Sequence, residues 1–330
     1  MFNGRSWRRL PLFAICVFIM TVNDASAQQP AIEVIYRSHD TTPYRITQHI
    51  DNVYWLNGIG NGRVIDPASH KFGPYEILAA SKTTGTVRVV GTSASIDLVL
   101  LESGGYIYKL DRSTIHRYKS SGGDEELVFE KPNYFEPVMA VSPSGLVYWL
   151  TQPESGGLLQ SMSIRDRRVT TLTFGEKTTN GGRAIADDNN VYWIETTGIL
   201  KAVSAQTGQL RQLSRNCRDI EALAADETHV YFISTLQGIM RVSKAAPLKI
   251  DRIGGPSGSY EISDLAVDDY FVYYISRDRI EKLSKAGGSV QNVATGLKLG
   301  SLLVDRDYVY FTEQGPDGNR LIARIAKTTR

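Results

Sequence analysis

Short runs of apolar residues alternate with tight polar turns along most of the chain. Residues 263–296, SDLAVDDYFVYYISRDRIEKLSKAGGSVQNVATG, show the pattern clearly: an apolar run, an Asp-led turn, a Val-Tyr-aromatic run, and two further runs separated by Lys- and Gly-bearing turns. No run is long enough for an ordinary helix. Four short antiparallel strands joined by tight turns are therefore the predicted structural unit.

The Val-Tyr run recurs seven times. Its valine-equivalent positions are 53, 107, 147, 191, 230, 272 and 309, which gives spacings of 54, 40, 44, 39, 42 and 37 residues. The one long spacing contains an insertion between Asn57 and Tyr75. A repeat of about 40 residues that holds four short strands predicts one blade of a β-propeller.

The two ends of the chain predict how the ring closes. The last repeat stops at the turn Lys327-Thr328-Thr329 and has no fourth strand, whereas residues 31–38, AIEVIYRS, form an alternating run with no blade of its own. Pairing these two segments would complete the seventh blade and remove an exposed sheet edge. We therefore predict an all-β fold, a seven-bladed β-propeller of four-stranded antiparallel blades, formed as one domain by residues 28–330.

The repeated polar residues have structural explanations. The tyrosines of the Val-Tyr runs are expected to fill the space between blades, with each hydroxyl finding a hydrogen-bond partner. The repeated Asp of D-x-x-x-V-Y is expected to accept hydrogen bonds from backbone N–H groups of the turn that follows. A set of calcium sites is the alternative for these carboxylates. The matching copies are Asp187–Tyr192, Asp226–Tyr231, Asp268–Tyr273 and Asp305–Tyr310.

The Asp-turn-Val-Tyr-aromatic strand, followed by segments such as RVSK (241–244) and LSKAGG (283–288), resembles the YWTD-like and TolB-like repeat propellers of exported bacterial proteins. The resemblance covers essentially the whole chain after residue 27. It implies the propeller architecture. Such families include receptor ectodomains, scaffold proteins and some enzymes, so the resemblance by itself assigns no activity.

The first 27 residues have the features of a secretory signal peptide. Arg5, Arg8 and Arg9 precede an apolar run from Leu10 to Val22, and Ala25-Ser26-Ala27 fits a small-x-small cleavage site. An uncleaved membrane anchor is the alternative, but a run of about 13 apolar residues is shorter than the ~20 that a membrane-spanning helix needs. We expect cleavage after Ala27 and a periplasmic or secreted protein that does not span the membrane.

Charge and cysteine content narrow the class of partner. The chain has 37 basic and 35 acidic residues, and the first 27 hold three Arg and one Asp, so 34 of each remain. Without a basic excess, nucleic acid is not an expected partner. Cys217 is the sole cysteine after residue 27, which excludes an internal disulfide. Neither a cofactor nor a metal is expected, and the oligomeric state is left open.

Candidate ligand-binding residues come from the predicted connections at the mouth of the central channel. Mixed arginines, carboxylates and tyrosines there would suit a small polar ligand or a protein partner, although solvated loop residues would have the same composition. The candidates are Tyr44, Arg45, Tyr134, Glu136, Arg183, Arg218, Asp219, Glu221, Tyr260, Glu261 and Asp264.

The motifs of known catalytic sites are absent from the sequence. There is no G-x-S-x-G elbow and no histidine pair at metal-binding spacing. Cys217 lies between Arg215 and Arg218, which could lower its pKa, but an incidental cysteine explains it equally well. We therefore favour a non-enzymatic binding or scaffold protein. The alternative is a hydrolase or lyase of a small polar or carbohydrate-like substrate, with Asp219, Glu221 and Glu261 as acid and base.

The insertion between Asn57 and Tyr75 is the one large departure from the repeat length. Its start, GIGNGR (58–63), is glycine-rich but follows a strand and opens no helix, so a nucleotide cradle is not predicted. A loop at the rim of the channel is the preferred interpretation. Because binding residues concentrate on loops carried by a rigid scaffold, the insertion is the first candidate for a specificity element.

Overall fold

The computed structural model describes most of the chain after residue 30, and the statements below refer to these residues. They are residues 31–38, 43–49, 51–58, 64–66, 71–72, 75–93, 99–110, 114–130, 140–151, 157–176, 184–195, 197–215, 217, 220–234, 236–256, 262–296, 298–315 and 319–327. The predicted signal peptide and its cleavage site lie outside them.

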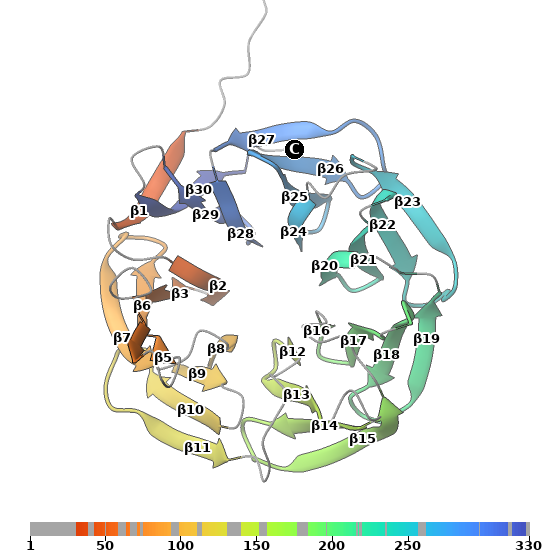
Figure 1. The fold of residues 1–330 in the computed structure, drawn as a ribbon, viewed down its shortest axis with the longest axis horizontal. Helices are drawn as coiled ribbons and strands as arrows, with labels where there is room; N and C mark the ends of the chain where they lie inside the picture. The colour runs from red at the N-terminus through yellow and green to blue at the C-terminus, as the bar shows by residue number, and fades with distance from the viewer. Residues whose placement is uncertain are drawn as a thin grey trace, which may run out of the picture.

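Seven four-stranded antiparallel sheets are arranged in a ring around a central opening (Figure 1). The predicted fold class is confirmed: the described residues form β-strands and turns, without helices. We number the blades in chain order, so that blade 1 contains β2, β3, β6 and β7, blades 2 to 6 contain β8 to β27 in groups of four, and blade 7 contains β28, β29, β30 and β1.

The innermost strands line the opening, and their lengths differ around the ring (Figure 1). They are β2 (Pro43–His49), β8 (Val99–Ser103), β12 (Ala140–Val141), β16 (Ala184–Ala186), β20 (Ile220–Ala225), β24 (Ile262–Val267) and β28 (Lys298–Val304).

The second strands carry the seven Val-Tyr runs predicted from the sequence. They are β3 (Asn52–Gly58), β9 (Tyr106–Leu110), β13 (Leu146–Leu150), β17 (Asn190–Ile194), β21 (His229–Ser234), β25 (Phe271–Ser276) and β29 (Tyr308–Gln314). The valine-equivalent side chain is fully buried in every copy, as expected for a β-branched residue in a strand covered on both faces. The tyrosine that follows is also buried, and these pairs form the core between blades.

The third and fourth strands complete each blade toward the circumference. The third strands are β6 (Tyr75–Ser81), β10 (Thr114–Lys119), β14 (Gly157–Ser163), β18 (Leu200–Ser204), β22 (Gly238–Ser243), β26 (Arg279–Ser284) and β30 (Arg320–Ala326). The outermost strands are β7 (Val87–Ser93), β11 (Glu126–Glu130), β15 (Val169–Glu176), β19 (Leu210–Ser214), β23 (Ile250–Gly254), β27 (Gln291–Thr295) and β1 (Ile32–Ser38).

The ring closes as the sequence predicts. Strand β1 pairs antiparallel with β30, from Ile32 opposite Ile325 to Ser38 opposite Arg320. A charged hydrogen bond from Arg324 Nε to Glu33 Oε2, 2.6 Å long, reinforces this pairing. The amino-terminal strand therefore supplies the outer edge of the last blade.

The hydrophobic core consists of clusters that lie between neighbouring blades. One cluster joins Tyr192 and Leu200 of blade 4 to Val230 and Phe232 of blade 5. The next joins Tyr231 of blade 5 to residues of blade 6, and the pattern continues around the ring. Each blade thus buries both faces of its sheet against its neighbours, and no blade has a complete core of its own.

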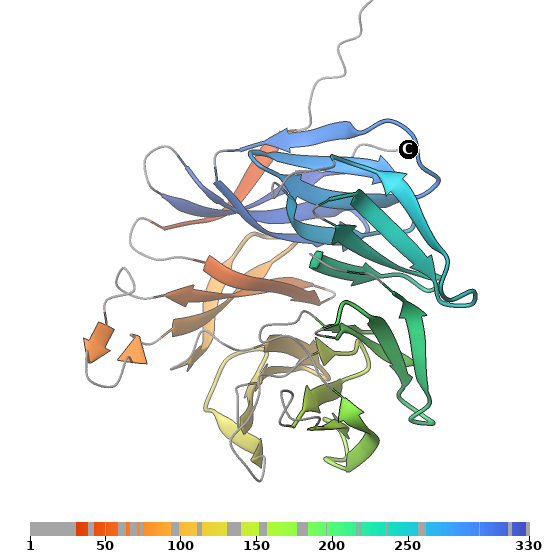
Figure 2. The same ribbon diagram turned by 45° about the vertical axis from the view of Figure 1, so that its right-hand side comes forward.

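The antiparallel order gives the ring two different faces. The turn face carries the connections from first to second and from third to fourth strands. The loop face carries those from second to third strands and from each fourth strand to the next blade. The insertion of blade 1 belongs to the loop face, where it contains the hairpin of β4 (Val64–Asp66) and β5 (Lys71–Phe72). In Figure 2 the two short orange arrows of this hairpin extend away from the ring.

Candidate functional site

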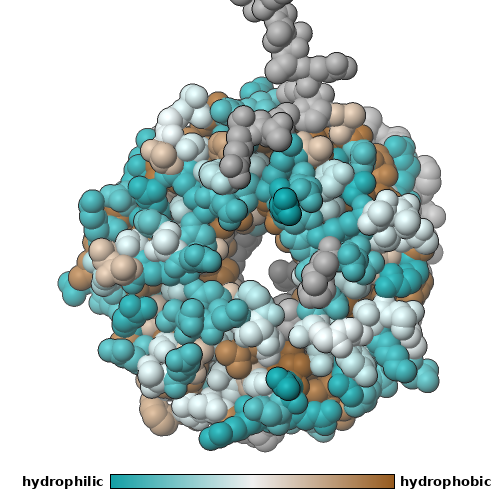
Figure 3. Space-filling view, turned by 180° about the vertical axis from the view of Figure 1, so that it is seen from behind, coloured by the Kyte–Doolittle hydropathy of each residue, from teal (hydrophilic) through white to brown (hydrophobic). Residues whose placement is uncertain are grey.

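The central opening is the one feature shared by all seven blades, and it passes through the ring in a space-filling view (Figure 3). Hydrophilic and hydrophobic residues both lie around it in that view. Among the innermost strands of blades 6 and 7, Ser263, Lys298 and Gly300 are exposed. All three lie near the loop-face ends of their strands, where Ser263 and Lys298 present polar side chains from neighbouring blades.

The sequence analysis predicts its candidate residues at this mouth. Tyr44 and Arg45 lie in β2, Glu221 in β20 and Asp264 in β24, each within the first three residues of an innermost strand. The side chains of Tyr44, Arg45 and Glu221 lie outside the described part of the chain. So do the remaining candidates, which are Tyr134, Glu136, Arg183, Arg218, Asp219, Tyr260 and Glu261. Their convergence stays a prediction.

Asp264 is the candidate whose side chain is described, and it joins two blades. Its Oδ2 accepts a hydrogen bond of 2.8 Å from the backbone N–H of Leu302 in β28, and its Oδ1 accepts one of 2.9 Å from Leu265 N–H. The Leu302 N–H is available because the pairing of β28 with β29 shifts register between Leu299 and Leu302. Asp264 therefore holds the innermost strands of blades 6 and 7 together, which is a positioning role at the channel wall.

A partly buried ion cluster that the sequence analysis missed joins blades 3 and 4 on the loop face. Lys201 Nζ lies 2.8 Å from Glu176 Oε2 and 3.3 Å from Glu195 Oε1, and the Glu176 side chain is only 5% exposed. Burial alone would lower the pKa of Lys201, but the two carboxylates outweigh it and raise the pKa. A lysine held charged between two carboxylates stabilises this blade boundary.

A second missed cluster lies in blade 2. Glu125 accepts a hydrogen bond from Lys109 Nζ, and His116 Nδ1 lies 3.1 Å from the same carboxylate. Burial works to raise the pKa of Glu125, but the hydrogen bond and charge of Lys109 lower it overall. Burial also raises the pKa of the neighbouring Tyr118 to about 12. The spacing of these residues in the sequence matches no known motif, so the cluster could not be identified from the sequence.

The repeated aspartates of the turn face have the structural role that the sequence predicted. Asp226 Oδ1 accepts hydrogen bonds from the N–H groups of Thr228 and His229, at 2.7 and 2.8 Å. Asp187, Asp268 and Asp305 make the same pair of bonds in their own turns. The second oxygen of each accepts the hydroxyl of the tyrosine five residues later.

The prediction that every repeated tyrosine has a hydroxyl partner is wrong for two blades. The hydroxyls of Tyr54 and Tyr148 are buried without a hydrogen-bond partner of good geometry among the described residues. In both blades the position of the turn aspartate holds another residue, His49 in blade 1 and Ser142 in blade 3. The missing carboxylate is therefore the reason for the missing bond.

Each of the four aspartates also binds a lysine of the next blade. Asp187 binds Lys244 at 2.5 Å, Asp226 binds Lys285 at 2.5 Å, Asp268 binds Lys327 at 2.6 Å, and Asp305 binds Lys82 at 2.8 Å. We call each pair a latch. Because the latch lysine occupies the carboxylate where a cation would sit, the alternative of calcium at these turns is not supported. In the described part of the chain, no group of three or more His, Cys, Asp or Glu residues could hold a metal ion.

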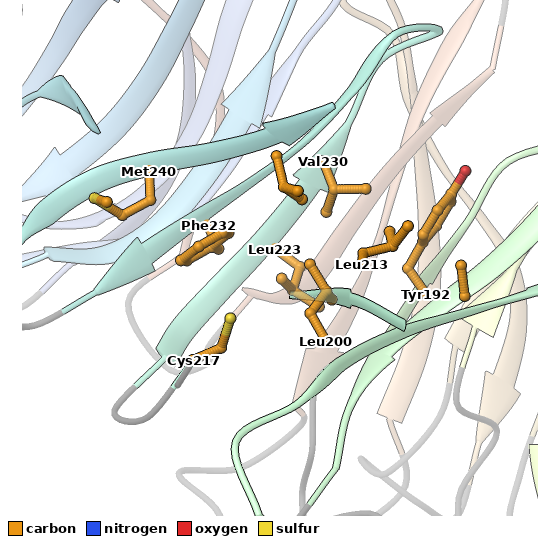
Figure 4. Close-up of a cluster of buried hydrophobic side chains, with 10 residues drawn as sticks. Tyr192, Leu200, Leu213, Cys217, Leu223, Val230, Phe232 and Met240 are labelled. Atoms are coloured by element: carbon orange, nitrogen blue, oxygen red, sulfur yellow. The ribbon is translucent and has the colours of Figure 1, made fainter. Parts of the chain in front are cut away.

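Cys217 is a core residue. Its side chain packs among Leu200, Leu223, Phe232 and Met240 (Figure 4), and its Sγ lies 3.2 Å from Ser214 Oγ. Burial raises the pKa of the Cys217 thiol, contrary to the expectation that the neighbouring arginines could lower it. Cys217 is 3% exposed and its thiol stays protonated. Of the two alternatives, a reactive or an incidental cysteine, these properties favour the incidental one.

Comparisons with known proteins support the architecture. No family model matches the chain, and no curated protein matches its sequence. Among solved structures, an oligogalacturonate lyase from Vibrio parahaemolyticus has a TM-score of 0.67 at 10% identity, over 92% of this chain and 95% of its own. An oligogalacturonate lyase in complex with manganese has a TM-score of 0.61 at 10% identity, over 90% and 99%.

A computationally designed protein is also similar, with a TM-score of 0.56 at 13% identity over 90% of this chain and all of its own. At these identities the likeness establishes the fold alone. No helix in the described residues could cross a membrane.

Proposed function

We propose that this chain is an exported, non-enzymatic binding or scaffold β-propeller that recognises a protein partner or a polar ligand with its loop face. The ring is the rigid support, and the connections around the channel mouth are the binding surface. The resemblance to YWTD-like and TolB-like repeat propellers belongs to the same proposal, as do the signal peptide at residues 1–27 and a periplasmic or secreted location.

The observation that carries the proposal is the difference between the two faces. On the turn face, four aspartates and four lysines have every described polar contact inside the ring, so they hold blades together. The loop face carries the β4–β5 hairpin, the only two-stranded sheet among the described residues, which departs from the blade repeat. Binding loops on a rigid scaffold are the common arrangement in proteins that recognise ligands.

A hydrolase or lyase at the same mouth is the second candidate. The observation in its favour is the fold shared with two oligogalacturonate lyases. Asp219, Glu221 and Glu261 would then supply the acid and base. Glycoside hydrolysis ordinarily uses a pair of carboxyl groups that flank the scissile bond, so the hydrolase form of this candidate depends on such a pair at the mouth.

Co-purification tests the proposal. The mature chain is immobilised and exposed to envelope extract beside a variant that lacks residues 58–74 and a Lys249→Met variant of the turn face. We expect a partner or ligand that binds the intact chain and Lys249→Met but is lost with the insertion. Equal capture by all three chains would contradict recognition by the loop face.

An activity assay separates the two candidates. The intact chain is incubated with oligogalacturonate, with and without manganese, and new reducing ends are measured. Turnover that disappears in a Glu221→Gln variant would replace the binding proposal with the enzymatic one. Absence of turnover together with insertion-dependent capture is the result expected here.

A further inference from the structure

The interfaces between blades are not equivalent on the turn face. Latches join blades 4 and 5, 5 and 6, 6 and 7, and 7 and 1, and in each the lysine comes from the later blade. Three of these interfaces have a second bond, in which an arginine of the earlier blade donates to the backbone carbonyl of the latch lysine. The pairs are Arg211 with Lys244, Arg241 with Lys285, and Arg324 with Lys82.

The other three interfaces lack both halves of the latch. In every blade, one backbone hydrogen bond identifies the residue that is equivalent to the latch lysine. Its N–H donates to a backbone carbonyl in the turn between the first and second strands of the same blade. In blades 2, 3 and 4 these residues are Ser120, Ile164 and Ala205. The residues at the aspartate position of the preceding blades 1, 2 and 3 are His49, Ser103 and Ser142. At each interface between blades, the aspartate and the lysine of the latch are therefore both present or both absent.

A further feature weakens the neighbouring boundary between blades 3 and 4. Tyr148 of blade 3 packs there against Val191 and Trp193 of blade 4. Its hydroxyl is buried and has no partner among the described residues, which carries the desolvation penalty of an unsatisfied polar group. In the latched blades the equivalent hydroxyls all bind aspartate.

The unlatched interfaces have other contacts of their own. Between blades 1 and 2, Tyr118 donates to Thr92 O at 2.6 Å and Arg88 donates to Ser120 O. Between blades 3 and 4, Lys201 and Glu176 pair on the loop face. Between blades 2 and 3, one described polar contact joins Arg167 to Glu126, two half-exposed side chains 3.7 Å apart. Such an exposed pair contributes little, and apolar packing around Ile164 and Trp149 joins the same two blades.

From these features we propose that the boundary between blades 2 and 3 is where the ring opens locally, while blades 4, 5, 6, 7 and 1 stay closed as one latched arc. Opening there would separate β8 from β12 and give access to the channel through its wall. The proposal concerns the ring itself and does not depend on the function proposed above. It assigns a place of local unfolding, which ordinarily falls where buried contacts and satisfied polar groups are fewest.

Hydrogen exchange of the mature chain, followed by mass spectrometry at neutral pH, tests the proposal directly. We expect peptides from β9 and β13 to exchange about 10-fold faster than peptides from β21 and β25, because exchange reports the free energy of local opening. These strands occupy the same place in their blades, so the comparison controls for depth in the sheet. Equal protection in the two pairs, or faster exchange in β21 and β25, would overturn the proposal.

Two variants test the cause. Lys285→Met removes the latch between blades 5 and 6 and should accelerate exchange in β21 and β25 while leaving β9 and β13 unchanged. Ser142→Asp combined with Ala205→Lys supplies both halves of a latch between blades 3 and 4 and leaves the boundary between blades 2 and 3 without one, so the fast exchange of β9 should persist. The single Ala205→Lys change, which adds a lysine without its acid, is the matched control and should give the same exchange in β9. If Lys285→Met accelerates all blades equally, the ring opens as a whole and the proposal fails.

Discussion

Lys285 Nζ of blade 6 lies 2.5 Å from Asp226 Oδ2 of blade 5. The Oδ1 atom of the same carboxylate accepts the backbone N–H groups of Thr228 and His229, and Oδ2 accepts the hydroxyl of Tyr231, so the carboxylate as a whole binds donors from two blades. The lysine ammonium also lies 5.2 Å from the centre of the Tyr231 ring. One acidic side chain therefore fixes a turn, orients a core tyrosine and joins two sheets.

Removing the lysine of this latch should destabilise the ring. Lys285→Met leaves a partly buried carboxylate without its counter-ion, and we expect the free energy of unfolding to fall by about 1–3 kcal/mol. Asp226→Asn should have an effect of similar size. The double variant should lose less than the sum of the two, since the second change removes a group that has already lost its partner.

Urea unfolding of the four chains measures this coupling. Lys249→Met is the control, because Lys249 is 78% exposed and its Nζ lies 3.7 Å from Asp251. Loss of such an exposed pair should change the free energy of unfolding by less than about 0.5 kcal/mol. Strict additivity of Lys285→Met and Asp226→Asn would show that the latch contributes nothing as a pair.

Two chemically identical substitutions should have different effects in different blades. Tyr231→Phe deletes a hydroxyl that donates to Asp226 at 2.8 Å, and should lower the free energy of unfolding by about 1 kcal/mol. Tyr148→Phe deletes a buried hydroxyl that has no partner among the described residues, and should be neutral or stabilising. Thermal or urea unfolding measures the change in stability of both variants. An equal loss of stability in both would refute the role assigned to the aspartate.

The fold could be predicted because its signals are local and repeated. A buried valine, or Ile107 in blade 2, followed by tyrosine marks the second strand of every blade, and in four blades an Asp-led turn before it binds its own backbone, as at Asp268 with Tyr270 and Phe271. The closing strand was predictable for a different reason. A repeat that lacks its fourth strand and an unpaired strand at the other end of the chain admit one economical pairing, which the contacts of Ile32 with Ile325 confirm.

The contacts between blades could not be predicted in the same way. The latch joins residues 57 to 59 positions apart, as in Lys244 with Asp187, and 223 apart in Lys82 with Asp305. The lysines were visible in the sequence as part of a turn motif, but nothing local says that each reaches the preceding blade. Glu176 with Lys201 has no repeated counterpart, so no pattern marks it. The candidate binding residues, apart from Asp264, remain predictions of position in the topology.

Acid should release the latches together. Burial would raise the pKa of Asp187, Asp226, Asp268 and Asp305, but the lysine of the next blade and the turn N–H groups outweigh it and lower the pKa of each. Because each pKa is lower in the folded than in the unfolded chain, the latches contribute their full stability above the unfolded value of about 4. That contribution is lost as the pH falls through the folded pKa values.

Unfolding midpoints between pH 7 and pH 2 measure this effect. We expect little change in the contribution of the latches from pH 7 to about pH 5, and a steep loss of stability below about pH 4. Asp226→Asn should be less stable at neutral pH and should lose less on acidification, since one of the titrating groups is gone. If Asp226→Asn and the unchanged chain lose the same stability on acidification, the role assigned to Asp226 is contradicted.

Removal of the amino-terminal strand should expose the edge of blade 7. Strand β30, with the sequence RLIARIA, would lose its pairing with β1, and Tyr36 would leave its place 5.1 Å from the ring of Trp55 in blade 1. An unpaired apolar edge promotes association between sheets, so a chain that starts at residue 39 should be less stable and should form higher oligomers. A chain that starts at residue 31 keeps β1 and is the control.

Light scattering after size-exclusion chromatography compares the two truncated chains with the chain that starts at residue 28. A synthetic peptide of residues 31–38 gives a further test, because it can occupy the vacant edge as an added strand. We expect the peptide to reduce the oligomers of the shorter chain, whereas a peptide in which Val34 and Tyr36 are both replaced by Asp should not. If the chain that starts at residue 39 matches the control in both stability and size, then the pairing of β1 with β30 does not hold the ring closed.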